Sequence, residues 1–456
     1  MNTKMRIEIK EHGNYNLLRT LFVVTKNTLT GGVTTMLKKN DTRQIEKRQR
    51  ITDKTLVIGM DIGCECNAMC LMNKEGTLLE RYPRIYNSRK GFDYFHKSIE
   101  TMKKKYGFTH VLIGMEPTGH YWRKIAFFAQ DKGYEVRFIR TTALKHQREL
   151  DESSSAKNDM RDAYTIANIV REGKYIDTII EDGIFRQLRT LAHTRERICR
   201  STTGSKNALK GVLEDYFPEL KNIFWSMKSR GLRALLEHCP FPEDVLTMGI
   251  EKLTHLIAKT TRRKVKAYEK ARRVYEAAQH SVGLTHIGEA DRLRVSSYLS
   301  DIKHSESQMK EIALQMGTLL KQIPSAEYIL SIPGIGVLTC GVFLGELGNP
   351  YHFKDPKQIV KYAGYDPQEH DSGQRITRRI ISRKGRWLLR KYLYFMAMRV
   401  VHISPFFSGY YENKQKTMEE KKKALCAVVI KLIKVIFALI RDKRMFVEPY
   451  CLKQAA

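Results

Sequence analysis

Apolar positions in residues 54–139 fall into short runs typical of buried strands, separated by longer stretches with helical spacing. The pattern predicts strands at 56–61, 67–73, 77–82, 110–116 and 135–139, and helices at 91–106, 120–132 and 163–172. Strands that alternate with helices indicate a sheet covered by helices, so we expect an α/β domain in this part of the chain.

Long helical patterns with few prolines replace this alternation after residue 180. Residues 252–278 and 292–322 each predict one long helix, and such helices commonly pair, within a chain or between subunits. Residues 337–345 and most of 387–445 also predict helices. The apolar run 424–440 contains Lys431 and Lys434, which favour an amphipathic or buried helix over a membrane span.

These patterns divide the chain of 456 residues into four parts. We expect a basic N-terminal extension at 1–53, an α/β domain at 54–178, a helical coiled-coil region at 179–325 and a mainly helical domain at 326–456. A hydrophobic content of 42% is sufficient for buried cores, and it excludes global disorder.

The net charge of the chain indicates which class of partner it binds. Lys and Arg total 80 and Asp and Glu total 49, which gives a formal net charge of +31. An excess of this size favours binding of a polyanion such as nucleic acid over a lysine-rich protein without such a partner. The cysteine group at 64–70 lacks the second pair of a zinc site, so we interpret these cysteines as ordinary thiols of a reducing compartment.

Four carboxylates form the first candidate site. Asp61 and Glu116 each end an apolar strand pattern, and Asp159 and Asp162 share one face of a predicted helix because they are three residues apart. If the four side chains converge, their mutual repulsion favours neutralisation by divalent cations, and two such ions can promote chemistry at phosphorus. The alternative is that they are unrelated surface acids.

A glycine motif at 332–336, Ile-Pro-Gly-Ile-Gly, precedes an apolar helix. This arrangement is typical of a helix-hairpin-helix, in which backbone N–H groups near Gly334 and Gly336 can face a DNA phosphate. Such a contact positions the DNA without reading its sequence. A plain glycine-rich turn is the alternative.

A serine followed by a basic tract is the third feature. Ser372 lies between Asp371 and Gly373, and residues 375–391 contain eight Arg or Lys and no acid. Basic groups stabilise charge on phosphorus, although a serine without an evident base is usually structural. The candidate nucleic-acid contacts in the tract are Arg375, Arg378, Arg379, Arg383, Lys384 and Arg386.

Together these segments resemble a known family. The matches are IGMDIG, GMEPTGHYW and KNDMRDAYTIA, followed by SIPGIGVLTCGVFLGELG, KYAGYDPQEHDSGQ and ISRKGRWLLRKYL. Their order over residues 56–440 is similar to that of transposases of insertion-sequence family one-ten (IS110), the Piv/MooV-related recombinases. Asn158 stands where this family usually has Thr or Ser.

The resemblance implies a RuvC-like first domain with the ribonuclease H fold, in which the four acids bind Mg²⁺ or Mn²⁺. It implies a coiled-coil dimerisation region and a last domain in which Ser372 attacks DNA and forms a covalent 5′-phosphoserine intermediate. The RuvC-like site of one subunit would join the serine domain of another. The metal ligands would be Asp61, Glu116, Asp159 and Asp162.

The partners that the resemblance implies are donor DNA, target DNA, an element-encoded bridge RNA and further copies of the chain, as a dimer that forms a tetramer on DNA. We expect a protein of the bacterial cytoplasm or nucleoid, with no membrane partner. Two other functions remain open: a RuvC-like nuclease or junction resolvase that does not rejoin DNA, and a non-enzymatic basic nucleic-acid-binding protein.

Overall fold

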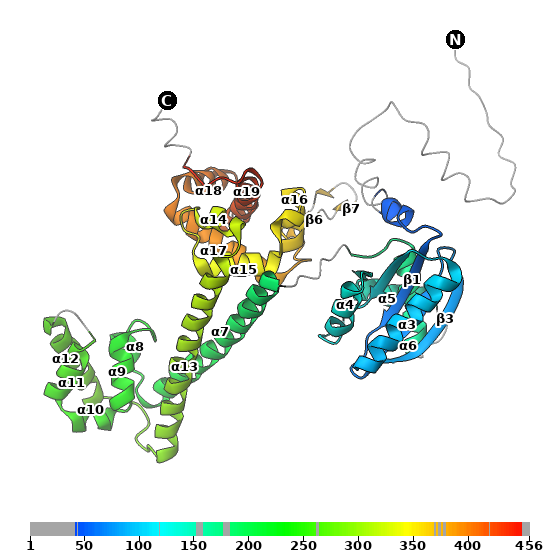
Figure 1. Cartoon of the computed structure of the whole chain (residues 1–456). Coiled ribbons are helices and arrows are strands. Elements are labelled where there is room, and N and C mark those ends of the chain that lie inside the picture. Colours follow the sequence, from blue (N-terminus) through cyan, green and yellow to red (C-terminus); the bar gives the residue numbers. More distant parts are fainter. Residues whose placement is uncertain are drawn as a thin grey trace, which may run out of the picture. The chain divides into compact units, whose positions relative to one another are not determined.

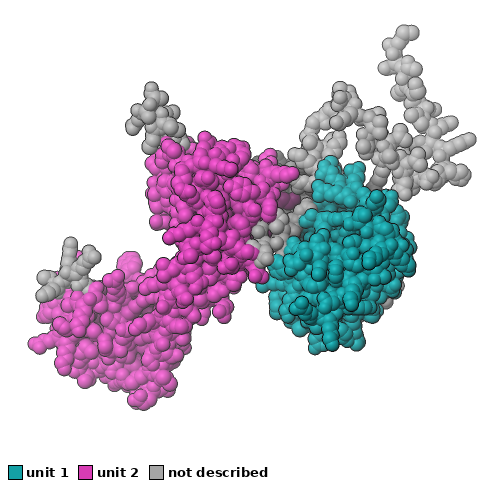
Figure 2. Space-filling model, in the orientation of Figure 1, with its two compact units in different colours: residues 1–180 teal, residues 181–456 magenta. Residues whose placement is uncertain are grey.

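The computed structural model describes residues 42, 44–117, 119–151, 158–176, 183–260, 264–368, 371–372, 375–376, 380–418 and 420–448. The chain forms two compact units, residues 1–180 and residues 181–456 (Figure 2). The first is a mixed α/β unit and the second is mainly helical, as the sequence pattern predicts.

A five-stranded sheet in the order β3-β2-β1-β4-β5 forms the centre of the first unit. β2 runs antiparallel to β1 and β3, whereas β1, β4 and β5 are parallel. The five strands confirm the predicted ones to within a few residues. Their bounds are Thr55–Asp61 for β1, Cys66–Met72 for β2, Leu78–Tyr86 for β3, His110–Met115 for β4 and Glu135–Phe138 for β5.

Helices cover both faces of this sheet (Figure 1). Leu56, Ile58 and Met60 of β1 belong to a core formed with α3 and α4, whereas Val57 belongs to a second core formed with α5 and α6. Because successive strand residues point to opposite faces, one apolar strand serves both cores. The helices are α3 (Arg89–Tyr106), α4 (Trp122–Asp131), α5 (Thr141–Asp151) and α6 (Asp159–Arg171).

Residues 44–51 pack on the first unit although they precede the boundary expected at residue 54. Ile51 is buried in the core beside α6. Gln44 donates a hydrogen bond to the carbonyl of Glu172, and Lys47 donates one to the carbonyl of Tyr175. This part of the predicted extension is therefore tied to the segment that follows α6.

Two long helices, α7 and α13, pack against each other in the second unit (Figure 1). One end of the pair contributes to a core with α8–α12, and the other end contributes Leu188, Met316 and Leu320 to the core of α14–α19. The helix predicted at 292–322 thus pairs within the chain with α7, and pairing between subunits stays a prediction. The bounds are α7 (Gly183–Tyr216), α8 (Leu220–Ile223), α9 (Arg230–His238), α10 (Pro242–Met248), α11 (Ile250–Ala258), α12 (Lys264–Gln279), α13 (Glu289–Leu320), α14 (Pro324–Leu330), α15 (Val337–Leu347), η1 (Pro350–His352), α16 (Pro356–Ala363), α17 (Trp387–Ile403), α18 (Pro405–Thr417) and α19 (Lys421–Asp442).

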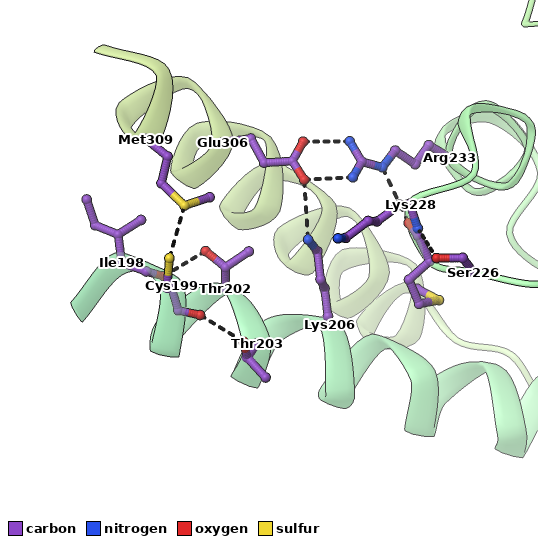
Figure 3. A network of polar contacts seen from close by, with 11 residues as sticks. Ile198, Cys199, Thr202, Thr203, Lys206, Ser226, Lys228, Arg233, Glu306 and Met309 are labelled. Atoms are coloured by element: carbon purple, nitrogen blue, oxygen red, sulfur yellow. Dashed lines mark hydrogen bonds and ion pairs between the residues drawn. The ribbon is translucent and has the colours of Figure 1, made fainter. Parts of the chain in front are cut away.

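An ion-pair network joins three of these helices (Figure 3). Glu306 of α13 accepts hydrogen bonds of 2.6 and 2.7 Å from the guanidinium of Arg233 in α9, and Lys206 of α7 lies 3.3 Å from the same carboxylate. The hydrogen bonds from Arg233 are the main reason that the pKa of Glu306 lies below its usual range. The network fixes α9 against the long helical pair.

One predicted helix is wrong. Residues 252–278 form not a single helix but α11 and α12, because α11 ends at Ala258. The hydroxyl of Thr260 donates to the carbonyl of Ile257 at 2.7 Å, a side-chain contact that competes with helix continuation. Among the described residues, no helix is long and apolar enough to cross a membrane.

Candidate active site

The two strand-end acids lie at neighbouring positions of the sheet. β1 and β4 are parallel, and Met60 is paired with Met115. Asp61 and Glu116 directly follow these residues, so they leave adjacent strands at the same edge. Adjacent strands are roughly 5 Å apart, which brings two of the four predicted carboxylates onto one short stretch of edge.

Paired glycines let α6 cross this part of the sheet at very short range. Gly59 and Gly114 are register partners, and each lies two residues before its acid. A Cβ at Gly59 would lie 2.0 Å from the carbonyl oxygen of Ala163, and a Cβ at Gly114 would lie 2.2 Å from a methyl group of Val170. At Gly59, where the contact is with backbone atoms of α6, only a residue without a side chain is compatible with this approach. The recurring Ile-Gly-Met pattern before both acids therefore reflects the approach of α6.

The start of α6 carries the other two acids. Asn158 caps the helix, because its side chain accepts a hydrogen bond of 3.0 Å from the N–H of Met160. Asn, Ser and Thr all serve well at such a position, so the departure of Asn158 from the family pattern keeps the cap. Asp159 is exposed in the first turn, and Asp162 is only 3% exposed. The helix dipole favours negative charge at this end.

Arg148 of α5 neutralises the buried carboxylate of Asp162. Its Nε donates a hydrogen bond of 2.6 Å to Oδ1, and its Nη2 lies 2.5 Å from Oδ2. Each oxygen of the carboxylate thus faces one nitrogen of the guanidinium. A buried carboxylate needs such a counter-charge, so Arg148 is a necessary part of this site. Sequence reasoning missed Arg148, because an arginine in the charged segment 145–151 is typical of any solvated helix.

A metal ion is implied by the family resemblance, and the donor atoms fit one. Carboxylate oxygens are the ligands that Mg²⁺ and Mn²⁺ prefer, and Asp159 presents an exposed carboxylate in the first turn of α6. Within the described residues, however, no three His, Cys, Asp or Glu side chains are grouped closely enough to hold a metal ion. The metal set thus remains a prediction in its full form.

The loops that follow Asp61 and Glu116 contact each other at this edge. A hydrogen bond between Tyr121 and Cys64 raises the pKa of the Tyr121 hydroxyl. Cys64 is exposed. The contact holds the two acid-bearing loops at the same part of the sheet edge.

The second candidate region contains two short hairpin ladders in the second unit. β7 (Asp371–Ser372) pairs with β8 (Arg375–Ile376), so that Ser372 is the register partner of Arg375. β6 (Pro367–Gln368) pairs with β9 (Ile380–Ile381). Arg378 and Arg379 lie outside the described residues, as do the side chains of Ser372 and Arg375.

Hydrogen bonds join the two ends of the segment 366–382, which contains these short strands. The hydroxyl of Ser382 donates a hydrogen bond to the carboxylate of Asp366, and the N–H of Ser382 donates to the carbonyl of Asp366 at 2.8 Å. Arg383, in the left-handed region with φ of 52°, donates its N–H to the carbonyl of Gly364. The chain therefore leaves and re-enters the helical core at one fixed point. Sequence reasoning missed Ser382, whose partner lies 16 residues earlier.

The basic residues after this point are only partly free to bind DNA. Lys384 is exposed, whereas Arg386 donates a hydrogen bond of 2.7 Å to the carbonyl of Glu346 and lies over the ring of Tyr362. Arg386 thus contributes to packing as well as to charge. Its predicted contact with nucleic acid stays a prediction, as do those of Arg383 and Lys384.

The glycine motif forms the turn between α14 and α15. Gly334 has a φ of 94°, and a Cβ there would lie 3.1 Å from the carbonyl oxygen of Arg399. The N–H of Gly336 donates to the hydroxyl of Thr339 at 3.2 Å. Both glycines thus have structural reasons within the fold, and their contact with phosphate stays a prediction.

Both candidate regions lie in parts of the chain that match transposase family models. A family model described as "Transposase" matches residues 58–218, and a second described as "Transposase IS116/IS110/IS902 family" matches residues 326–412. The first covers the four acids and the second covers Ser372 with its basic tract.

Individual proteins give the same picture. A 43.6 kDa protein of insertion element IS110 from Streptomyces coelicolor is 25% identical over 69% of this chain and 78% of its own length. The pilin gene-inverting protein of Moraxella lacunata is 30% identical over 35% of this chain and 51% of its own length. The transposase of element IS1111A from Coxiella burnetii is 20% identical over 76% of this chain and 78% of its own.

Proposed function

Since the chain belongs to the IS110 family of DNA transposases, we propose that it cuts and rejoins DNA with a RuvC-like carboxylate site and with Ser372 as the nucleophile. The observation that carries the carboxylate part is the register of β1 and β4, which puts Asp61 and Glu116 side by side at one sheet edge. The close crossing of α6 at Gly59, two residues before Asp61, adds support for Asp159 and Asp162 as members of the same site.

Asp61, Glu116, Asp159 and Asp162 would hold one or two Mg²⁺ or Mn²⁺ ions. A bound ion of this kind stabilises the charge that develops on phosphate oxygens during strand breakage. Arg148 lowers the cost of keeping Asp162 ionised in its buried position. The cap from Asn158 holds the first turn of α6, so that both helix-borne acids keep a fixed direction.

Ser372 would break the strand by transesterification. Its oxygen forms a bond to phosphorus, the bond from phosphorus to the 3′ oxygen breaks, and the hydroxyl proton ends on the released 3′-hydroxyl. The product is a 5′-phosphoserine, and attack by a second strand's 3′-hydroxyl reverses the step and rejoins DNA. The basic residues after Ser372, with Arg383 and Lys384 among the described ones, would stabilise the charged phosphate.

The second candidate is a RuvC-like nuclease or junction resolvase that uses the four acids alone. The specific observation behind it is that the carboxylate residues and Ser372 lie in different compact units of the chain. The two functions differ in the role of the serine, because only the recombinase forms a covalent link to DNA.

Adduct formation on a supercoiled donor plasmid tests the proposal. We expect Ser372→Ala to abolish protein–DNA adducts in denaturing gels, and Asp61→Asn or Asp159→Asn to abolish recombinant product. Ser297→Ala and Asp301→Asn, exposed positions on α13, are the matched controls. Adducts that persist in Ser372→Ala would make the serine assignment wrong, and DNA cleavage without rejoining would favour the nuclease.

Kinship alone supports two further parts of the proposal. These are an element-encoded bridge RNA that specifies donor and target, and a dimer that forms a tetramer on DNA. Sequencing the RNA that co-purifies with the protein tests the first, and light scattering with and without DNA tests the second.

A further inference from the structure

A stripe of side chains on α17 carries two exposed aromatic rings with a cation between them. Trp387, Lys391 and Phe395 follow each other at intervals of four residues, so they share one helix face. Trp387 is 42% exposed and Phe395 is 39% exposed, and the ammonium of Lys391 lies 5.8 Å from the Phe395 ring centre. We call these three residues the α17 stripe.

The neighbouring helix α7 places a guanidinium and an imidazole beside the Trp387 ring. The guanidinium of Arg200 lies 4.8 Å from the centre of the Trp387 ring. The imidazole of His193 meets the same ring edge-on, with ring centres 6.4 Å apart. Trp387 therefore presents an aromatic surface in a frame of basic groups.

Two buried carboxylates fix the direction of these cations. Glu196 accepts hydrogen bonds of 2.7 and 2.9 Å from Lys391 and lies 3.3 Å from Arg200. Both cations remain more than one-third exposed, whereas the Glu196 side chain is only 6% exposed. An exposed lysine or arginine ordinarily samples many rotamers, and a buried partner removes that freedom before any ligand binds.

Glu346 of α15 orients two side chains of α7 in the same way. It is 2% exposed, lies 2.7 Å from His193 and lies 3.5 Å from Arg189. Burial alone would raise the pKa of Glu346, but the hydrogen bond from His193 and the charges of Arg189 and Arg386 outweigh it and hold that pKa below its usual range. The carboxylate is thus ionised and keeps its cations in place.

From these contacts we propose that the α17 stripe, with Arg200 and His193, binds an unpaired segment of single-stranded DNA by stacking bases on Trp387 and Phe395. An aromatic ring stacks on a base only when that base has a free face, which a duplex does not offer. Arg189, Arg200, Arg386 and Lys391 outnumber Glu196 and Glu346, so the surface keeps a positive charge suited to phosphates.

The dimensions also suit a strand. Eight residues of helix separate the two rings by roughly 12 Å, which corresponds to three or four nucleotides at about 3.4 Å each. α17 begins within the basic tract that follows Ser372. A strand released near the proposed nucleophile could continue along the stripe, so the inference rests on the chain acting on DNA but not on Ser372 itself.

Equilibrium binding to a fluorescent thymidine oligonucleotide tests the stripe without any cleavage. We expect Trp387→Ala to weaken binding by about 5- to 100-fold, the usual effect of losing one stacked base. Trp387→Phe should keep most of the affinity, because it keeps a ring. Trp225→Ala is the matched control, since Trp225 is fully exposed in the loop between α8 and α9. Arg200→Gln should lower the slope of binding against salt by about one.

Four results would overturn the inference. They are unchanged binding in Trp387→Ala, an equal loss in Trp225→Ala, an equal loss on duplex of the same length, and a loss confined to a uridine RNA oligonucleotide. If circular dichroism shows that Trp387→Ala does not fold, the single variants Trp387→Phe and Arg200→Gln test the inference instead. An unchanged salt dependence of binding in Arg200→Gln then overturns the inference. Because binding does not need Ser372, failure here leaves the adduct experiment unaffected.

Discussion

Adding one methyl group at Gly59 should separate α6 from the sheet and disable the carboxylate site. A Cβ there would lie 2.0 Å from the oxygen of Ala163 and 2.4 Å from the nitrogen of Ala167, whereas ordinary contact begins at 3.4 Å. The deficit of 1.4 Å falls on backbone atoms of α6. No rotamer change can relieve it, so the helix or the strand must move.

The size of the effect follows from that displacement. Overpacking of a core costs about 1–3 kcal/mol, which lowers a melting temperature by about 2–4 °C per kcal/mol. A catalytic group displaced by about 1 Å loses on the order of a hundredfold in rate. We therefore expect Gly59→Ala to fold with reduced stability and to lose DNA cleavage far more than stability alone explains.

Alanine substitutions at two other glycines provide a graded comparison and a control. Gly114→Ala should have a smaller effect, since the nearest atom is a side-chain methyl of Val170 that can rotate away. Gly204→Ala is the matched control within helix α7, where a Cβ meets nothing within 4 Å and should stabilise by about 0.5–1 kcal/mol. Urea denaturation and plasmid cleavage measure the series. A Gly59→Ala protein with normal stability and full cleavage would refute this reasoning.

Three other substitutions test single contacts. Arg148→Gln leaves Asp162 buried without its cation, so we expect a loss of about 1–3 kcal/mol and a larger gain in melting temperature on adding Mg²⁺ than the unsubstituted chain shows; an equal Mg²⁺ response contradicts this. Arg233→Met should cost about 1–3 kcal/mol by removing the hydrogen bonds to Glu306, and an unchanged urea midpoint would count against it. Because the pKa of Glu346 is lowered in the folded chain, its stabilisation is present above the unfolded value of about 4.3 and is lost as the pH falls through the folded value. Glu346→Gln should flatten urea midpoints between neutral and acid pH, and an unchanged pH profile argues against this role.

The sheet was predictable because its signal is local. Each strand from β1 to β5 is a short apolar run between polar turns, and burial on both faces requires such runs. The acids Asp61 and Glu116 could be placed at strand ends for the same reason. That they share one edge depends on the parallel pairing of β1 with β4, which the strand patterns alone do not specify.

Contacts between distant residues were not predictable. Arg148 and Asp162 are 14 residues apart and belong to different helices, and Glu196 and Lys391 are 195 residues apart. A charged residue that makes such a contact has the same sequence pattern as one that faces water. The end of α11 at Ala258 was missed as well, because helical spacing of apolar residues continues past it.

The two candidate regions are held in place by different physical means, and this bears on how each can act. The carboxylate edge depends on backbone packed against backbone at Gly59, an arrangement with almost no freedom to adjust. The segment that carries Ser372 leaves the helical core next to Asp366, whose carboxylate accepts a hydrogen bond from the hydroxyl of Ser382. A rigid edge of this kind suits the proposed metal site of four acids, because small displacements weaken metal binding.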